Sequence, residues 1–374
     1  MKGLAAVFTG GQRPVEIVEL EVPKVEPGGI LIRNTGAAVC GSDLHGSRGD
    51  GDGPPSSRKM VGGHECSGIV DILGAGVSTD SMGRRLKEGD RVVYPFFFPC
   101  LRCYQCVHGE LHACPNRLHP RFKTEKFEDY PSCDGGFAQY WNLPPGHFVF
   151  KVTDSIPDRV LATVNCSLSQ VTWAIHQGAM KFGDTVVIQG AGGLGIYATA
   201  IAADAGASRV IVVDGQSARL DLAKRCGATD TIDLREYESP DSRVSKVREL
   251  TNGVGADVVV EVVGVAAATP EGLDMVRAGG KYVDVGNISG GSFTLAGNRL
   301  IRGQIHWIGV AHYNPWILEN AVSWLERVSE KYPLYDLVSH TFPLDRIEQA
   351  FDTAEWSGKA EGSVATRVVV EPWG

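Results

Sequence analysis

The chain has 374 residues, and its 44 acidic and 36 basic side chains give a formal net charge of −8. This length predicts two domains, because a single core rarely grows beyond about 300 residues. The negative charge excludes nucleic acid as an expected partner, since phosphate binding needs a basic face. The sequence has no apolar run of about 18 residues, so no membrane span or membrane partner is expected.

The first 150 residues read as short β-strands separated by glycine and proline. Apolar, β-branched stretches at 28–33 and 90–94 are flanked by turn residues. The stretches 50–55 and 116–136 are rich in polar residues, and we interpret both as loops. This half of the chain therefore predicts a β-rich domain.

Four cysteines follow the spacing C-x2-C-x2-C-x7-C, at Cys100, Cys103, Cys106 and Cys114. Four thiolates this close in sequence can surround one tetrahedral zinc, which would leave no open position for chemistry. Disulfides are one alternative, but the N-terminus lacks the pattern of a secretion signal, so we expect a cytoplasmic protein, where disulfides are rare. An iron–sulfur cluster is the other alternative, although the last gap of seven residues is longer than in bacterial ferredoxins.

A sparser set of metal-binding side chains surrounds this cluster in the sequence. Cys40 begins the run C-G-S-D-L-H, His64 lies in G-H-E, and Cys166 follows about 100 residues later. Two cysteines and one histidine are a ligand set of catalytic zinc, with the fourth position open to substrate. Asp43 is a candidate to hold the second ring nitrogen of the histidine, and Glu65 could shape the field at the metal.

Strands and helices alternate after residue 160. Apolar strands are expected at 184–189, 209–214, 257–263 and 280–285, with helices at 196–205 and 218–226. This alternation predicts a parallel sheet covered by helices on both faces. The last part of the chain returns to mixed patterning, with a helix at 315–331 and a strand at 366–370.

A glycine-rich G-x-G-x-x-G motif joins the first of these strands to its helix. Its glycines allow a tight turn and a close approach of pyrophosphate to the helix N-terminus. Asp214 ends the next strand, 19 residues after Gly195, where a carboxylate accepts hydrogen bonds from ribose hydroxyls and repels a 2′-phosphate. We therefore expect NAD rather than NADP, although Arg219 lies close to the acid. The expected cofactor contacts are Gly190, Gly192, Gly193, Leu194, Gly195, Asp214, Arg219 and the strand ends Val263, Val285 and Val310.

These motifs, in this order and spacing, resemble the zinc-dependent medium-chain alcohol dehydrogenase family over nearly the whole chain. The resemblance implies an α/β protein with a GroES-like β-rich catalytic domain (1–167 and 311–374, with a structural zinc lobe at about 96–116) and an inserted Rossmann domain (168–310). It implies two zincs, one structural in the cysteine lobe and one catalytic on Cys40, His64 and Cys166. By the same resemblance, Ser42 takes the proton of the alcohol, His45 passes it toward solvent, and Phe96 lines the substrate pocket.

The expected activity is therefore hydride transfer between a primary or secondary alcohol and NAD, in a homodimer or homotetramer. A zinc-free quinone or enoyl reductase of the same fold, or a non-catalytic zinc- and nucleotide-binding relative, is the alternative. Gln170 departs from the family pattern, which usually has threonine at this position, and the loop 116–136 with Cys133 is longer than the minimal pattern. We interpret Cys66 and Cys226 as packing residues.

Overall fold

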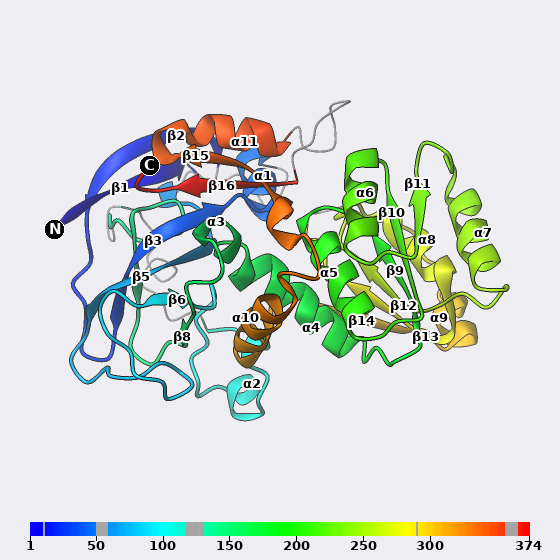
Figure 1. Ribbon diagram of the computed structural model, residues 1–374, viewed down its shortest axis with the longest axis horizontal. Helices are drawn as coiled ribbons and strands as arrows, with labels where there is room; N and C mark the ends of the chain where they lie inside the picture. Colours follow the sequence, from blue (N-terminus) through cyan, green and yellow to red (C-terminus); the bar gives the residue numbers. More distant parts are fainter. Residues whose placement is uncertain (10–11, 50–58, 117–126, 128–130, 289–290, 356–365) are drawn as a thin grey trace.

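The computed structural model describes residues 1–9, 12–49, 59–116, 127, 131–288, 291–355 and 366–374. The β-rich part and the α/β part lie side by side, with helices α4 (Ser169–Gln177), α5 (Gly193–Asp204) and α10 (Trp316–Val328) near their junction (Figure 1). The predicted loop 50–55 and most of the predicted loop 116–136 lie outside the described residues. Within the described ranges, no helix is long and apolar enough to cross a membrane.

The β-rich part contains two sheets, both built mainly from antiparallel pairs. A small sheet has the order β2 (Gln12–Glu21), β1 (Lys2–Thr9), β4 (Lys59–Val61). A larger one has the order β15-β16-β3-β5-β6-β8, with β7 paired to β3. Its strands are β3 (Ile30–Ala38), β5 (Glu65–Leu73), β6 (Arg91–Val93), β7 (Tyr140–Leu143), β8 (Phe150–Lys151), β15 (Val338–Pro343) and β16 (Arg367–Glu371).

The C-terminal segment thus returns to the N-terminal part of the chain. The last strand, β16, pairs with β3, and α11 (Ile347–Glu355) packs on β16. β3 ends just before Cys40. The pairing of β16 with β3 therefore fixes the start of the C-G-S-D-L-H run against the C-terminal strand. The expected return of the C-terminus to the catalytic part is therefore present.

The α/β part is one parallel sheet of six strands. Its order is β11 (Asp230–Asp233), β10 (Arg209–Asp214), β9 (Thr185–Gln189), β12 (Ala256–Glu261), β13 (Val276–Asp284) and β14 (His306–Gly309). The predicted strands 184–189, 209–214, 257–263 and 280–285 correspond to β9, β10, β12 and β13. β12 ends two residues earlier than predicted, which leaves Val262 and Val263 in the loop beyond the strand.

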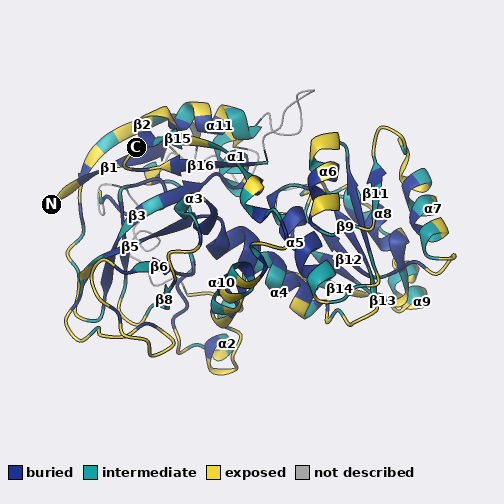
Figure 2. Cartoon of the chain, viewed as in Figure 1, coloured by how far each residue is buried: buried dark blue, intermediate teal, exposed yellow. Residues whose placement is uncertain are grey.

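Both faces of this sheet are covered, as the continuous apolar strands predicted (Figure 2). Val186 and Ile188 point into a core shared with α4 and α5, whereas Val187 between them belongs to the opposite core. The helices of the domain are α5, α6 (Ser217–Arg225), α7 (Pro240–Leu250), α8 (Ala268–Met275) and α9 (Asn298–Gly303). The predicted helix 196–205 begins three residues earlier, at Gly193, so the glycine motif itself forms the first turn of α5.

Candidate active site and metal centres

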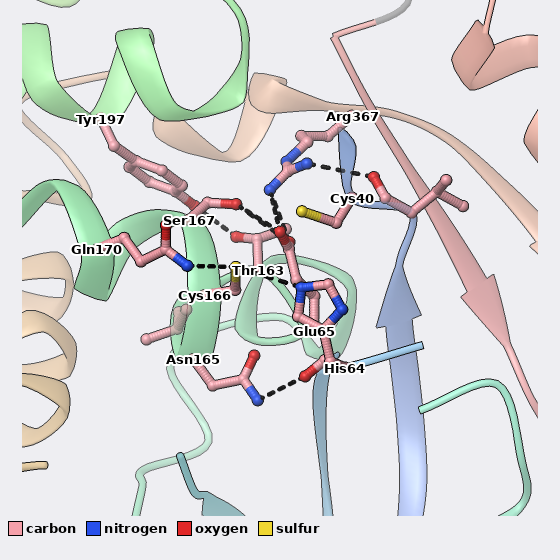
Figure 3. A network of polar contacts seen from close by, with 12 residues as sticks. Cys40, His64, Glu65, Thr163, Asn165, Cys166, Ser167, Gln170, Tyr197 and Arg367 are labelled. Carbon is pink, nitrogen blue, oxygen red and sulfur yellow. Dashed lines mark hydrogen bonds and ion pairs between the residues drawn. The ribbon is translucent and has the colours of Figure 1, made fainter. Parts of the chain in front are cut away.

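Cys40, His64 and Cys166 meet at the junction of the two parts (Figure 3). Cys40 precedes α1 (Gly41–Arg48), His64 immediately precedes β5, and Cys166 lies in η4 (Val164–Leu168), a turn of π-helix. Single π-turns occur often at functional sites because the additional residue redirects a side chain. The sulfurs, one imidazole nitrogen and one carboxylate oxygen of Glu65 all lie within 4.8 Å of one another.

This arrangement fits a zinc ion. Donors at the usual Zn–S distance of about 2.3 Å on a tetrahedron lie about 3.8 Å apart, and the Cys166 Sγ to His64 Nε2 distance is 3.5 Å. Three protein donors leave the fourth coordination position of a zinc open. All three residues line one cavity, which is called the main cavity below. The site therefore has both the ligands and the opening that a catalytic metal needs.

Asp43 lies where a partner for the histidine ring was expected. Its Oδ1 is 3.6 Å from His64 Nδ1, and its Oδ2 accepts the Cys40 backbone N–H at 2.9 Å. Burial opposes the charged imidazole, but Asp43 and Cys40 raise the pKa of His64 well above its usual range. One carboxylate thus orients the histidine and fixes the backbone of the first cysteine.

Glu65 does not stand free beside the metal ligands. Its fully buried carboxylate accepts two contacts from Arg367 Nη2, at 2.7 and 2.6 Å, and the Ser167 hydroxyl at 3.1 Å. Burial raises the pKa of Glu65 to about 7, against the lowering effect of Arg367. Arg367 also donates to the Val39 carbonyl oxygen, at 3.2 Å. Arg367 and Ser167 were not predicted, since nothing in the sequence connects residue 367 with residue 65.

The two residues expected to carry the proton lie on α1. Ser42 and His45 are half-buried and line the main cavity. Arg48 Nη2 lies 3.0 Å from His45 Nδ1, and Arg48 Nη1 is 2.8 Å from Glu355 Oε1 on α11. The arginine therefore fixes the orientation of the imidazole from its outer side.

The cysteine lobe forms a second donor set. Cys103 Sγ lies 3.5 Å from Cys106 Sγ and 3.7 Å from Cys114 Sγ, near the spacing of a tetrahedral zinc–sulfur site. All four sulfurs lie within 4.8 Å of one another, and none is in a disulfide. The backbone amide of Arg102 lowers the pKa of Cys100 to about 6, whereas burial raises the pKa of Cys106 and of Cys114. The lobe has the geometry for a structural zinc.

The glycine motif has the conformation that a dinucleotide requires. Gly190 has φ +99°, and a Cβ on Gly195 would lie 1.8 Å from the Gly190 carbonyl oxygen. A Cβ on Gly192, the residue that caps α5, would meet no heavy atom of the described chain within 4 Å. Open space at the start of a 12-residue helix is where a pyrophosphate can approach backbone N–H groups.

Asp214 ends β10 beside this loop and also supports it. Its Oδ2 accepts the Ala191 N–H at 2.7 Å, and its Oδ1 accepts the Gln216 N–H at 2.8 Å. Arg219 is half-buried on α6. The carboxylate that was expected to bind ribose therefore also fixes the shape of the glycine turn.

Glu261, at the end of β12, was not anticipated from the sequence. Its carboxylate accepts the backbone N–H groups of Val263, Gly264 and Gly286, at 2.6, 2.9 and 3.1 Å. Burial raises the pKa of Glu261 to about 7. This carboxylate joins the two strand ends that carry Val263 and Val285.

The donor set and the strand ends share one cavity of about 670 Å³. Leu194, Val263 and Val285 line it, whereas Val310 is buried and its neighbours Ala311 and His312 line the cavity instead. The ring of Phe96 lies 4.9 Å from that of His64, which places it in the cavity as expected. Further aromatic side chains that line the cavity were not predicted from the sequence: Phe8, Phe97, Phe98, His112 and His312.

A nucleotide-binding fold with a Cys–His–Cys donor set at its crevice defines a metal-dependent dehydrogenase. Residues 26–154 match the alcohol dehydrogenase GroES-like domain family, and residues 193–327 match the zinc-binding dehydrogenase family. The chain is 32% identical to the 5-exo-hydroxycamphor dehydrogenase of Pseudomonas putida, over 91% of this chain and 92% of that protein. It is also 32% identical to the erythritol/L-threitol dehydrogenase of Mycolicibacterium smegmatis, over 97% of both.

The crystal structure of an alcohol dehydrogenase from Thermotoga maritima superposes with a TM-score of 0.87, at 30% identity over 99% of both chains. The chain belongs to the zinc-dependent medium-chain alcohol dehydrogenase family. It is an oxidoreductase that acts on CH–OH groups with zinc and a nicotinamide cofactor. The predictions of family, fold class and reaction class are confirmed.

Proposed function

We propose that Cys40, His64 and Cys166 hold the catalytic zinc and that the reaction takes place in the cavity beside them. The observation that carries this proposal is the convergence of these three donors next to the strand ends of the nucleotide-binding sheet. When bound, zinc supplies a Lewis acid that favours the ionised alcohol and polarises the carbonyl product. Ser42 accepts the hydroxyl proton, and His45, oriented by Arg48, passes it toward solvent.

The four-cysteine lobe holds the second zinc in this proposal, in a structural role. Leu111 N–H donates to Asn314 Oδ1 at 3.0 Å, so the lobe is attached to the segment that carries His312. A metal that fixes the lobe therefore also fixes one wall of the cavity. The proposed catalytic domain consists of residues 1–167 and 311–374, and the proposed nucleotide-binding domain of residues 168–310. The main cavity then lies between these two domains.

NAD is the proposed cofactor rather than NADP. Asp214 lies at the strand end where the ribose of a bound dinucleotide is expected, and its negative charge disfavours a 2′-phosphate. The nicotinamide is expected against Val263 and Val285.

The proposed substrate is a neutral primary or secondary alcohol with an apolar body. The described lining residues include no lysine or arginine, and Phe96, Phe97, Leu111 and Ile288 form much of the wall. The amide nitrogens of Gln170 and Asn116 each donate one hydrogen bond to a cysteine sulfur. Of the substrates named for the relatives, a ring-bearing alcohol such as hydroxycamphor fits this lining better than a tetritol.

A homodimer or homotetramer in the cytoplasm is the proposed state of the protein. β14 is one of the two outer strands of the parallel sheet, and its Trp307 is 38% exposed. An open strand edge with apolar side chains favours pairing with a second copy. None of the nine cysteines, all of which lie within the described residues, forms a disulfide, which suits a reducing compartment.

The test is a panel of alcohols and ketones followed by NADH absorbance, with light-scattering mass as a parallel readout. We expect activity with cyclic or aryl alcohols, a kcat/KM at least about tenfold lower with linear polyols, and a clear preference for NAD. A protein that contains zinc and binds NAD but oxidises no alcohol would support the non-catalytic alternative. Activity toward quinones or enoyl substrates without metal would support the zinc-free alternative.

A further inference from the structure

Gln170 makes a direct contact with one of the proposed zinc ligands. Its amide Nε2 lies 3.2 Å from Cys166 Sγ (Figure 3). Gln170 is in the first turn of α4, four residues after Cys166, and residues at this spacing share one face of a helix. The side chain is half-buried and lines the main cavity.

The chemistry of the two groups fixes the direction of this hydrogen bond. A thiolate sulfur only accepts, and of the two ends of a glutamine amide only the nitrogen donates. Threonine, the residue usual in the family here, carries its hydroxyl on Cβ, whereas the glutamine amide is two carbon atoms further out. The longer side chain is what carries a donor to the sulfur of Cys166.

We infer that Gln170 is a positioning residue of the proposed catalytic zinc site, which holds Cys166 Sγ and withdraws negative charge from it by hydrogen bonding. The inference rests on the proposed function, because it assigns Cys166 to the metal. Groups that hydrogen-bond to metal ligands fix their orientation and set how much charge they donate to the ion. A thiolate that shares charge with an amide donates less to the metal, so the ion becomes a stronger Lewis acid.

The contact also fixes the sulfur between two neighbours. His64 Nε2 lies 3.5 Å from Cys166 Sγ, and Gln170 approaches the same sulfur from α4. These two neighbours therefore define the position of the Cys166 sulfur. Loss of the amide should reduce metal affinity, because the lost positioning of the sulfur outweighs its stronger charge donation, and it should also change the electronic character of the site.

The experiment replaces Gln170 and reads out the metal site by its spectrum. Gln170→Leu removes the donor at similar size, and Gln170→Thr introduces the residue usual in the family. Gln177→Leu is the matched control, because it makes the same change seven residues later on the same helix. In each protein, cobalt(II) replaces zinc at the Cys40 site while the lobe keeps its zinc, and the sulfur-to-cobalt charge-transfer band is recorded.

We expect the band of Gln170→Leu and Gln170→Thr to move to longer wavelength, since a sulfur without the hydrogen bond gives up its electron more readily. Zinc affinity at this site, measured by competition with a chelator, should fall roughly tenfold. The Gln177→Leu protein should match the wild type in both measurements. Gln170→Thr keeps the test available if Gln170→Leu does not fold.

A cobalt band and a zinc affinity that do not change in either Gln170 variant would overturn the inference, and the alcohol dehydrogenase proposal would stand. A wild-type protein that binds no cobalt through Cys40 and Cys166 would instead overturn the proposed metal site, and the role of Gln170 with it. The two failures are therefore distinguishable.

Discussion

Arg367 and Glu65 form a buried ion pair, in which one guanidinium nitrogen lies 2.7 and 2.6 Å from the two carboxylate oxygens. The pair joins the last strand of the chain to the strand that follows His64. It lies behind the metal ligands, because Glu65 adjoins His64 in sequence and Arg367 reaches the carbonyl of Val39, next to Cys40. A contact between residues 302 positions apart thus supports two of the three proposed zinc ligands.

Arg367→Met should destabilise the protein strongly. The substitution leaves the Glu65 carboxylate buried without its cation, and breaking a buried pair in this way typically costs about 3–5 kcal/mol. The measurement is the urea midpoint of the transition that releases the β-rich domain. Arg225→Met is the matched control, since Arg225 pairs with Asp336 at the surface, and its midpoint should not move. An Arg367→Met midpoint equal to that of the control would contradict a supporting role for the pair.

Metal content should separate the two cysteine sets. We expect two zincs per wild-type chain by elemental analysis, without acid-labile sulfide. Cys40→Ala should lose one zinc and its activity but keep its circular dichroism spectrum. Cys106→Ala should lose the other zinc and lower the thermal midpoint, because the lobe that it fixes has little core of its own. One zinc in the wild type, or activity in Cys40→Ala, would contradict the assignment.

The sequence predicted best those features that depend on neighbouring residues. The spacing of Cys100 to Cys114 and of Gly190 to Gly195 is local, so the chain alone predicts both motifs. The four sulfurs do lie within 4.8 Å of one another, and the glycine motif does lead into α5. Cys40, His64 and Cys166 could be grouped only by residue type and by resemblance to a family, because their spacing does not define a shared site.

The supporting residues could not be predicted, for a physical reason. Arg367, Ser167 and Glu261 act through pairings between strands and turns that are distant in sequence, and no periodicity records which buried carboxylate receives which donor. Val310 does not line the cavity for a related reason, and its contact with the nicotinamide stays a prediction. The strand β14 ends at Gly309, so the side chain after it turns into the core and the next two residues reach the cavity.

Asp214→Asn should weaken the preference for NAD. The amide keeps an oxygen for one backbone N–H but removes the charge that repels a 2′-phosphate, so the ratio of kcat/KM for NAD over NADP should fall at least about tenfold, or ~1.4 kcal/mol. Asp221→Asn is the control, because this carboxylate is 72% exposed on α6, the helix that follows Asp214 in the chain. An unchanged ratio in Asp214→Asn would show that another group selects the cofactor.

The pH dependence of stability should reveal the contact between α5 and α10. Asp204, at the end of α5, accepts hydrogen bonds from Trp324 Nε1, Arg327 Nη2 and Lys331 Nζ, at 3.0, 2.7 and 2.9 Å. Burial opposes the charged carboxylate, but these donors lower the pKa of Asp204 to about 2. An unfolded aspartate has a pKa of about 3.9, so the carboxylate stabilises the fold above that pH and loses its contribution as the pH falls toward 2.

Asp204→Asn should therefore be less stable than the wild type at pH 6, by about 1–2 kcal/mol once screening of the exposed Arg327 and Lys331 is allowed for. The difference should stay constant down to about pH 4.5 and shrink below pH 4, because the wild-type carboxylate then takes up a proton on unfolding. Thermal midpoints of both proteins between pH 6 and pH 3 provide the measurement. Asp336→Asn is the control, because the described ion pair of Asp336 with Arg225 lies at the surface. Its thermal midpoint should differ little from that of the wild type at every pH. A difference between Asp204→Asn and the wild type that does not depend on pH would mean that the three donors hold the helix end by geometry and not by charge.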